Sequence, residues 1–204
     1  MNRDSHITAK LTVVPFVEER WDDLEKLFGK SGACEGCWCM FWRLSSKEYK
    51  NTSAEDRKNA LYELSRDLNH PPGLLCYADD KAVGWLGFGP RKSMNRILRS
   101  RVIPKVDDQD VWSIVCFFIH KEYRGIGMSS ALLEAAKEYA AANNIGILEA
   151  YPVDTENNKI NSASAYCGIL SVFERQEFLE ITKTKSKVAT KGRVLVRLEV
   201  TPQK

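Results

Sequence analysis

Short apolar stretches separated by polar turns run through the whole chain, and many are rich in β-branched residues. Such stretches predict strands, here at residues 7–16, 74–78, 82–88, 111–119, 147–151, 178–182 and 194–201. Residues 74–78 and 82–88 are joined by a tight polar link, which predicts an antiparallel hairpin. Residues 111–119 are apolar almost throughout, so we expect this strand at the centre of a sheet.

Helical spacing of apolar residues appears in four further stretches, at residues 18–28, 54–68, 128–142 and 164–175. Ser53 can cap the second helix, with Asp56 three residues later as a weaker capping-box partner. The order of the elements predicts a mixed α/β (α+β) fold. We expect a single domain over residues 1–204, with a mostly antiparallel sheet of about six to seven strands and helices on both faces.

Composition narrows the class of protein. The 204 residues carry 30 basic and 27 acidic side chains, a net charge of +3. This balance does not indicate a nucleic-acid partner. The amino terminus lacks the apolar segment of a signal peptide, and no stretch approaches the roughly 20 apolar residues that span a bilayer. We therefore expect a cytoplasmic protein with no membrane partner.

Residues 124–130 place two glycines and two serines between an expected strand and an expected helix. The first amides of a helix are unpaired and attract anions, and small side chains leave them accessible. Gly125 and Gly127 permit close approach, while Arg124 adds a cation suited to phosphate. The segment predicts a pyrophosphate cradle. An ordinary tight turn between strand and helix is the alternative. The segment is neither a P-loop, because it has no lysine, nor a dinucleotide fingerprint, because it has no third glycine.

The same segment resembles the acyl-CoA-binding motif of the GNAT family, the GCN5-related N-acetyltransferases. Their pattern [QR]-x-x-G-x-[GA] fits residues 124–129, with Ser129 in place of the last small residue. Residues 173–178 (FERQEF) are similar to the later (Y/F)-E-K-x-G-F stretch, with Glu177 in place of glycine. The order of the elements also resembles the single-domain fold of this family, and the chain looks similar to a bacterial-type branch of it.

The resemblance implies acetyl-CoA as co-substrate and a primary amine of a small molecule or peptide as acceptor, attacked directly in a ternary complex. It also implies that main-chain groups of the strand end bond pantetheine and the acetyl carbonyl, while the cradle holds the pyrophosphate. The residues concerned are Phe117, Phe118, Ile119, Arg124, Gly125, Ile126, Gly127, Met128, Ser129 and Ser130. A homodimer is left open.

The proton-transfer residues are less clearly marked. The resemblance places Phe173 where the family commonly has a tyrosine acid. Tyr166 lies two helical turns earlier on the expected helix, so it is a substitute acid, a cofactor contact or a packing residue. Glu149 and His120 are candidate bases, although each also suits a structural ion pair or a strand end.

Residues 34–43 (CEGCWCMFWR) form an unusual loop with three cysteines. Three thiols without a matching fourth ligand do not indicate zinc, so we expect no metal. The resemblance places this loop at the acceptor pocket, with Trp38 and Trp42 as wall residues or as core. Two other functions remain alternatives: a non-catalytic acyl-CoA sensor (a degenerate GNAT module) and a zinc- or thiol-dependent regulatory protein built on this loop.

Overall fold

One seven-stranded sheet organises the computed structural model, which describes residues 10–156, 158–161, 163–188 and 190–202. The strands are β1 (Leu11–Pro15), β2 (Gly73–Ala78), β3 (Lys81–Pro90), β4 (Trp112–Ile119), β5 (Ile147–Ala150), β6 (Leu179–Val188) and β7 (Lys191–Glu199). Their order in the sheet is β1-β2-β3-β4-β5-β7-β6. Among these described strands only β4 and β5 pair in parallel, so the expected mixed, mostly antiparallel sheet is confirmed.

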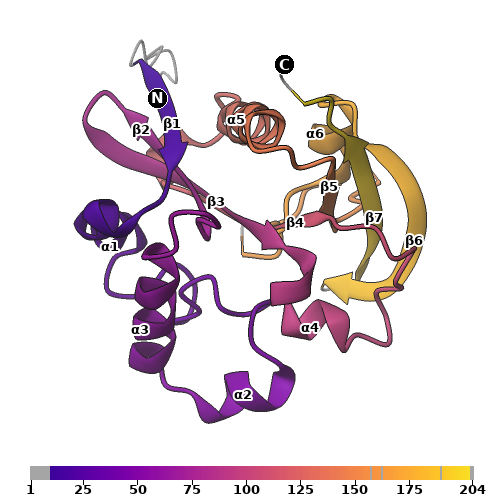
Figure 1. Ribbon diagram of the computed structural model, residues 1–204, viewed down its shortest axis with the longest axis horizontal. Helices are drawn as coiled ribbons and strands as arrows, with labels where there is room; N and C mark the ends of the chain where they lie inside the picture. Colours follow the sequence, from indigo (N-terminus) through magenta and orange to yellow (C-terminus); the bar gives the residue numbers. More distant parts are fainter. Residues whose placement is uncertain (1–9, 157, 162, 189, 203–204) are drawn as a thin grey trace.

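Helices cover both faces of the sheet (Figure 1). The α-helices are α1 (Trp21–Phe28), α2 (Ser46–Asn51), α3 (Ala54–Ser65), α4 (Asn95–Leu98), α5 (Met128–Ala142) and α6 (Leu170–Glu174). Short 3₁₀ turns are η1 (Glu18–Arg20), η2 (Arg91–Ser93) and η3 (Lys121–Tyr123). Figure 1 shows α5 and α6 on one side of the sheet and α1 to α4 on the other.

Two apolar clusters correspond to these two faces. Under α5, the buried residues Leu132, Ala136 and Ala140 lie four positions apart, so they share one face of the helix and pack on the sheet. On the other face, Leu24 of α1 and Leu61 of α3 pack with Trp85 of β3. Burial of the sheet on both sides explains why β2 is buried at every position.

Two predicted elements differ from the structure. The helix expected at residues 164–175 is wrong in its first half, because α6 begins only at Leu170. Gly168 adopts a φ of 80°, and a Cβ there would lie 2.6 Å from the Phe173 ring, so a regular helix cannot pass through it. The short helix α2 was not predicted at all. It is too polar to show a helical period, and its signal is the Ser45–Glu48 capping box.

The last hairpin is longer than predicted. The expectation ended the first strand of this pair at residue 182, whereas β6 runs to Val188. Its outer half alternates lysine with smaller residues and forms the edge of the sheet, where lysines discourage pairing with another chain. The first expected strand began at residue 7, and residues 7–9 lie outside the described part of the chain.

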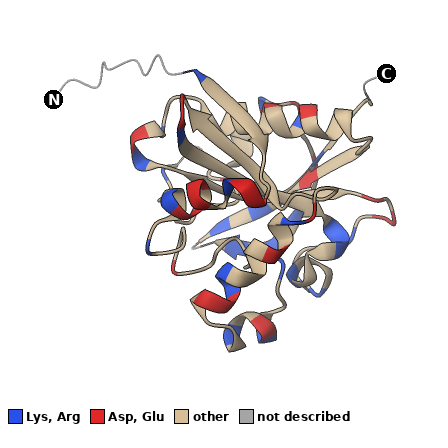
Figure 2. Ribbon diagram, turned by 60° about the vertical axis from the view of Figure 1, so that its left-hand side comes forward, with Lys and Arg blue, Asp and Glu red and all other residues tan. Residues whose placement is uncertain are grey.

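Basic and acidic residues are interspersed along the helices and loops of the ribbon in Figure 2. None of the described helices is long and apolar enough to cross a bilayer.

Replacing Ser53 tests the local origin of α3. Its hydroxyl accepts from the Asp56 amide at 3.1 Å, and the Asp56 carboxylate accepts from the Ser53 amide at 2.8 Å. Ser53→Ala removes the cap, so we expect the free energy of unfolding to fall by about 1 kcal/mol in urea titrations. Ser53→Thr retains a capping hydroxyl and should keep most of that stability. Equal losses in both variants would contradict the role of the cap.

Candidate active site

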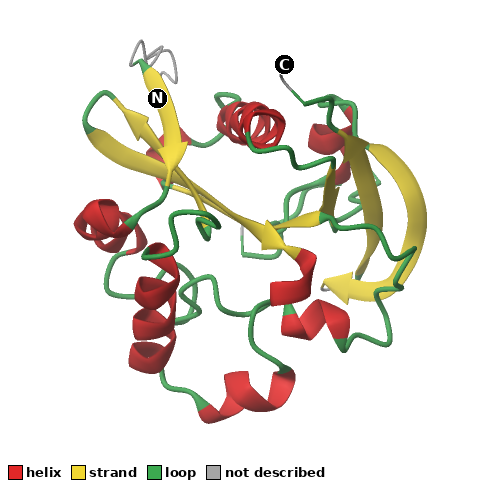
Figure 3. Ribbon diagram, viewed as in Figure 1, coloured by secondary structure: helices red, strands yellow, loops and turns green. Residues whose placement is uncertain are grey.

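The parallel strands β4 and β5 separate part-way along their length. They pair only through residues 112–114 and 148–150, while β4 continues to Ile119. A cavity of about 830 Å³ opens beside the free half of β4. We call it the cleft. Its walls come from the end of β4, the start of α5, the segment before α6 and the loop between α1 and α2, which carries no helix or strand (Figure 3).

The glycines before α5 form one end of the cleft. Gly125 and Gly127 have φ values of 81° and 84°, in the left-handed region that disfavours other residues. A Cβ built on either would meet nothing within 4 Å, so the space over the backbone is open. Since Gly127 is the N-cap of α5 without a side-chain cap, the first amides of this 15-residue helix face that space. The arrangement suits a phosphate group.

Most of the residues expected to bind the cofactor line the cleft, and Ile126 alone of them does not. Those on the lining are Phe117, Phe118, Ile119, Arg124, Gly125, Gly127, Met128, Ser129 and Ser130. The Ile126 side chain is 46% exposed. The Nε of Arg124 donates to the Ile119 carbonyl at 2.8 Å, which ties the strand end to the cradle. Arg175, which the sequence did not single out, adds a second lining cation.

The main chain of β4 needs one correction. The Phe117 amide donates to the Tyr166 carbonyl at 2.6 Å, so it is engaged within the protein and is not available to pantetheine. The His120 amide donates to Val83 of β3, and backbone groups alternate between the two edges of a strand. The main-chain groups of Phe117 and Ile119 therefore face the cleft edge, where no hydrogen bond within the described part of the chain engages the Ile119 amide or the Phe117 carbonyl.

Tyr166 lines the cleft, but not from a helix shared with Phe173. It belongs to a turn lodged in the gap beside β4, where Cys167 Sγ also lies 3.2 Å from the Val115 carbonyl. The Tyr166 hydroxyl accepts from Arg193 Nη2 at 3.0 Å. Burial raises the pKa of this phenol, mainly by desolvation and then by the nearby Cys167 thiol, so Tyr166 keeps its proton well above neutral pH. Phe173 is fully buried against Phe117.

The loop between α1 and α2 forms the opposite wall. Phe41 and Trp42 line the cleft together with Tyr49 of α2. Trp38 does not line it. Its ring stacks 6.0 Å from Trp21, under Gly32, and it belongs to the core. Of the two tryptophans expected at the pocket, Trp42 is therefore on the wall and Trp38 is behind it.

Four cysteines also line the cleft, namely Cys34, Cys37, Cys39 and Cys116. All are free thiols. Among the described residues no group of three or more histidine, cysteine, aspartate or glutamate side chains could hold a metal ion. The C-x-x-C-x-C loop thus contributes three thiols to the wall of the cleft.

Glu149 lies outside the cleft, and its position does not suit a base. The side chain is fully buried, with Oε1 3.1 Å from Arg91 Nε and Oε2 2.8 Å from Arg197 Nε. The Tyr151 hydroxyl also donates to it. With both oxygens held by cations and a phenol, Glu149 is a structural counter-ion. The correction follows from burial, which requires a charge to be paired.

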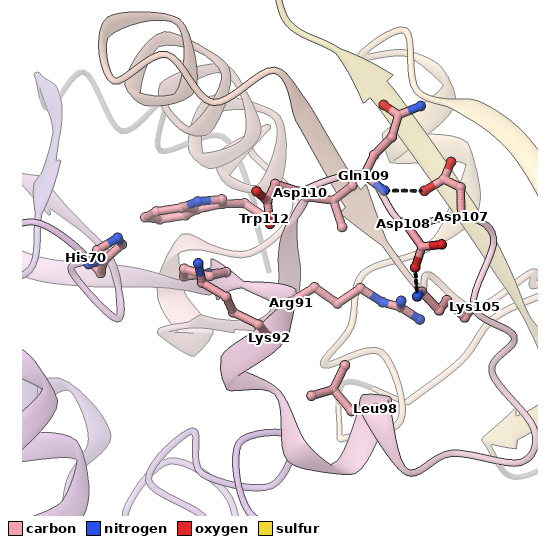
Figure 4. Close-up of a pocket in the computed structure, with 12 residues that line it drawn as sticks. His70, Arg91, Lys92, Leu98, Lys105, Asp107, Asp108, Gln109, Asp110 and Trp112 are labelled. Atoms are coloured by element: carbon pink, nitrogen blue, oxygen red, sulfur yellow. Dashed lines mark hydrogen bonds and ion pairs between the residues drawn. The ribbon is translucent and has the colours of Figure 1, made fainter.

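Arg91 extends from this cluster into a second, polar cavity of about 320 Å³ at the other end of β4 (Figure 4). Its walls include a His70 ring stacked 5.9 Å from Trp112 and the acidic residues Asp107 and Asp108. Lys105 pairs with Asp108, and Arg197 Nη1 lies 2.6 Å from Asp107. The charges of this cavity are largely neutralised by one another. It lies away from the glycine cradle.

His120 also lies off the cleft lining. It precedes η3, its Nδ1 is 3.7 Å from the Glu122 carboxylate, and its ring packs on Tyr123. These contacts are those of a strand end.

Comparisons with known proteins agree with this geometry. A model of the acetyltransferase (GNAT) family matches residues 38–168. Similar solved structures include a GNAT-family acetyltransferase of Streptococcus pneumoniae, at 14% identity and a TM-score of 0.54, covering 94% of this chain and 99% of that chain. An N-acetyltransferase of Staphylococcus aureus Mu50 has 14% identity and a TM-score of 0.56, covering 94% and 99%. The protein yncA of Salmonella typhimurium, solved with its cofactor acetyl-CoA, has 14% identity and a TM-score of 0.55, covering 95% of both chains. No curated protein matches the sequence.

The buried position of Glu149 predicts a stability defect. Glu149→Gln leaves Arg91 and Arg197 without their shared carboxylate, and breaking a buried pair costs about 3–5 kcal/mol. We expect a loss of this order in the free energy of unfolding, measured by denaturant titration. The control Glu156→Gln replaces an exposed carboxylate that pairs with Lys191 and should change stability by less than about 1 kcal/mol. A fully stable Glu149→Gln protein would show that the cluster is not a structural one.

Proposed function

The chain belongs to the GNAT acetyltransferase family, and from this premise we propose that it transfers acetyl from acetyl-CoA to a primary amine of a small molecule or peptide. The observation that carries the proposal is the cleft, in which an open glycine cradle at a helix start continues into the free edge of β4. The six cysteines, free throughout, favour a reducing compartment, and we propose the cytoplasm. We further propose that one acetyltransferase domain spans residues 1–204.

The residues of the cradle fit the anionic end of acetyl-CoA. The first amides of α5 would hold the pyrophosphate, assisted by the hydroxyls of Ser129 and Ser130 and by the charge of Arg124. Along β4 the Ile119 amide and the Phe117 carbonyl would bond the pantetheine arm. Acetyl-CoA supplies an activated thioester, whose carbonyl a main-chain donor can polarise.

The acceptor would enter from the wall made by the loop between α1 and α2. Phe41, Trp42 and Tyr49 offer apolar faces there, and Glu35 is the one carboxylate among the described lining residues. An acidic group at this wall favours the approach of a protonated amine. We propose direct attack of the amine in a ternary complex, with both ligands held in the same cleft.

Tyr166 is the proposed proton donor to the departing sulfur. Its neutral phenol lines the cleft, and Arg193 holds the hydroxyl oxygen as an acceptor, so its proton remains available for donation. Phe173 cannot take this role because it has no hydroxyl and is fully buried.

A screen of amines tests the proposal directly. Mass spectrometry would detect the acetylated product, and CoA release should depend on the added amine. A second function, an acyl-CoA sensor, is favoured by Phe173 in place of a tyrosine. Tight binding of acetyl-CoA without product from a broad panel of amines would support the sensor.

Gly127→Asp tests the cradle. The variant forces a side chain into a left-handed position and places a carboxylate where the pyrophosphate would lie. We expect the affinity for CoA, measured by calorimetry, to fall at least about tenfold, which is 1.4 kcal/mol. Gly146→Asp is the matched control, since this exposed glycine also has open space around its Cβ position but lies after α5. Unchanged affinity in Gly127→Asp would reject the placement of the pyrophosphate.

Tyr166→Phe tests the proton donor. Loss of a general acid typically costs about 10²-fold or more in turnover, whereas packing of the ring is preserved. We expect kcat to fall by that order while the dissociation constant of acetyl-CoA changes by less than about twofold. Equal losses in turnover and in affinity would make Tyr166 a cofactor contact instead.

A further inference from the structure

Arg43 is a buried cation that has no carboxylate partner within the described part of the chain. Its side chain is 6% exposed, and Nη2 donates to the carbonyls of Pro72 and Phe88, both at 2.8 Å. Its Nε has no hydrogen-bond partner among the described residues, and no described carboxylate lies within 4.0 Å of the guanidinium. Desolvation lowers the pKa of this arginine. A buried charge is normally paired, so an anion of another kind is expected beside Arg43.

The ionisable groups that act on Arg43 are the thiols of Cys39 and Cys116. Cys39 Sγ and Cys116 Cβ both lie over Gly87, 2.4 and 3.3 Å from the position that its Cβ would take, and Trp85 Nε1 donates to Cys39 Sγ at 3.3 Å. Both thiols line the cleft on the side of the acceptor wall. The pair is therefore within the cavity that we assign to the reaction, and it faces a cation that needs a partner.

Two glycines of β3 make room for this arrangement. Gly87 and Gly89 lie two residues apart and so share one face of the strand. A Cβ on Gly87 would lie 2.4 Å from Cys39 Sγ, and a Cβ on Gly89 would lie 3.4 Å from Arg43 Nη1. The sulfur thus occupies space that a Cβ on Gly87 would fill, and the guanidinium lies within ordinary contact distance of the position over Gly89.

The two sulfurs differ in how readily each loses its proton. The hydrogen bond from Cys116, the charge of Arg43 and the indole of Trp85 together lower the pKa of Cys39 to about 7, against the opposing effect of burial. The same hydrogen bond and burial raise the pKa of Cys116 well above its usual value. Of the two thiols, Cys39 is therefore the one that loses its proton first, close to neutral pH.

We propose that the Cys39 thiolate, paired with Cys116 and Arg43, is the catalytic base that takes the proton from the attacking amine. This inference rests on the proposed function. It supplies the base that neither Glu149 nor His120 can provide from outside the cleft.

The step balances as follows. The bond between nitrogen and the carbonyl carbon forms, the carbon–sulfur bond breaks, and the electron pair leaves on the CoA sulfur. The acceptor first releases its ammonium proton to water and attacks as the neutral amine. One proton then passes from nitrogen to Cys39, and one passes from the Tyr166 hydroxyl to the CoA sulfur. Cys39 then loses its proton to water and Tyr166 takes one from water, so that amine and acetyl-CoA become amide and CoA.

Other groups around the pair modify its charge without replacing it. Cys37, on the same loop, and Cys167, on the turn beside β4, both act on Cys116 and raise its pKa further. Burial also raises the pKa of Cys37 and of Cys167, so these thiols stay protonated. The charge of Arg193 lowers the pKa of Cys167, but by less than burial raises it.

The first test uses the wild-type protein and iodoacetamide, and it needs no acceptor. The rate of alkylation of Cys39, followed by peptide mass spectrometry from pH 5 to pH 10, should rise with a midpoint near pH 7. Saturating acetyl-CoA should slow it. Cys76 is the internal control, because burial raises its pKa to about 11 and it lies outside the cleft. A Cys39 midpoint at or above about 8.5, the value of an ordinary thiol, would overturn the proposal.

The second test uses variants and an amine found by the screen. Cys39→Ser should lower kcat about 10²-fold and remove the acidic limb near pH 7 from the profile of kcat/KM, with acetyl-CoA affinity unchanged within about twofold. Cys76→Ala should retain the wild-type profile. Normal turnover in a folded Cys39→Ser protein would overturn the role of Cys39 as the base. A wild-type protein that does not bind acetyl-CoA would instead overturn the proposed function itself.

Discussion

The divergence of β4 from β5 after Ile114 is the constraint on which the rest of the molecule depends. A parallel pair that stayed together would bury the backbone of residues 115–119, and no ligand could reach it. Separation leaves backbone groups unpaired, and buried groups of this kind must find partners. The protein satisfies part of them itself, because the turn at Tyr166 and Cys167 enters the gap and bonds Phe117 and Val115. What remains open is the edge of Ile119 and the start of α5.

Glycine positions on one strand, at one helix start and on one turn follow from the same constraint. Gly168 allows the turn to approach Phe117 and Phe173, and Gly127 ends the strand-to-helix connection in a left-handed conformation. On the opposite face Gly87 and Gly89 leave the space that Cys39 and Arg43 fill. Glycines on both faces of the sheet therefore leave the space around the cleft that larger side chains would occupy.

Local patterns in the sequence were sufficient for the sheet and for the cradle. Helix α5 was predicted with its observed bounds, because its apolar spacing and its flanking glycines agree. The failures have physical causes. Helix α6 was predicted too long, since spacing alone does not reveal that Gly168 packs under an aromatic ring. Glu149 was a candidate base because its arginine partners lie 58 and 48 residues away in the chain, so only the fold brings them together. The Cys39–Cys116 contact is long-range in the same sense.

The buried arginines of the protein have two different kinds of partner, a carboxylate in one case and thiols in the other. Arg91 and Arg197 share the buried carboxylate of Glu149, so their cluster is a fixed structural element. Arg43 instead lies near two thiols, and its charge helps to lower the pKa of Cys39 to about 7. A carboxylate beside Arg43 would neutralise it more completely but would be a weak proton acceptor, because its pKa would fall well below neutral pH. A thiol pair combines a counter-ion for the buried cation with a proton acceptor that titrates near pH 7.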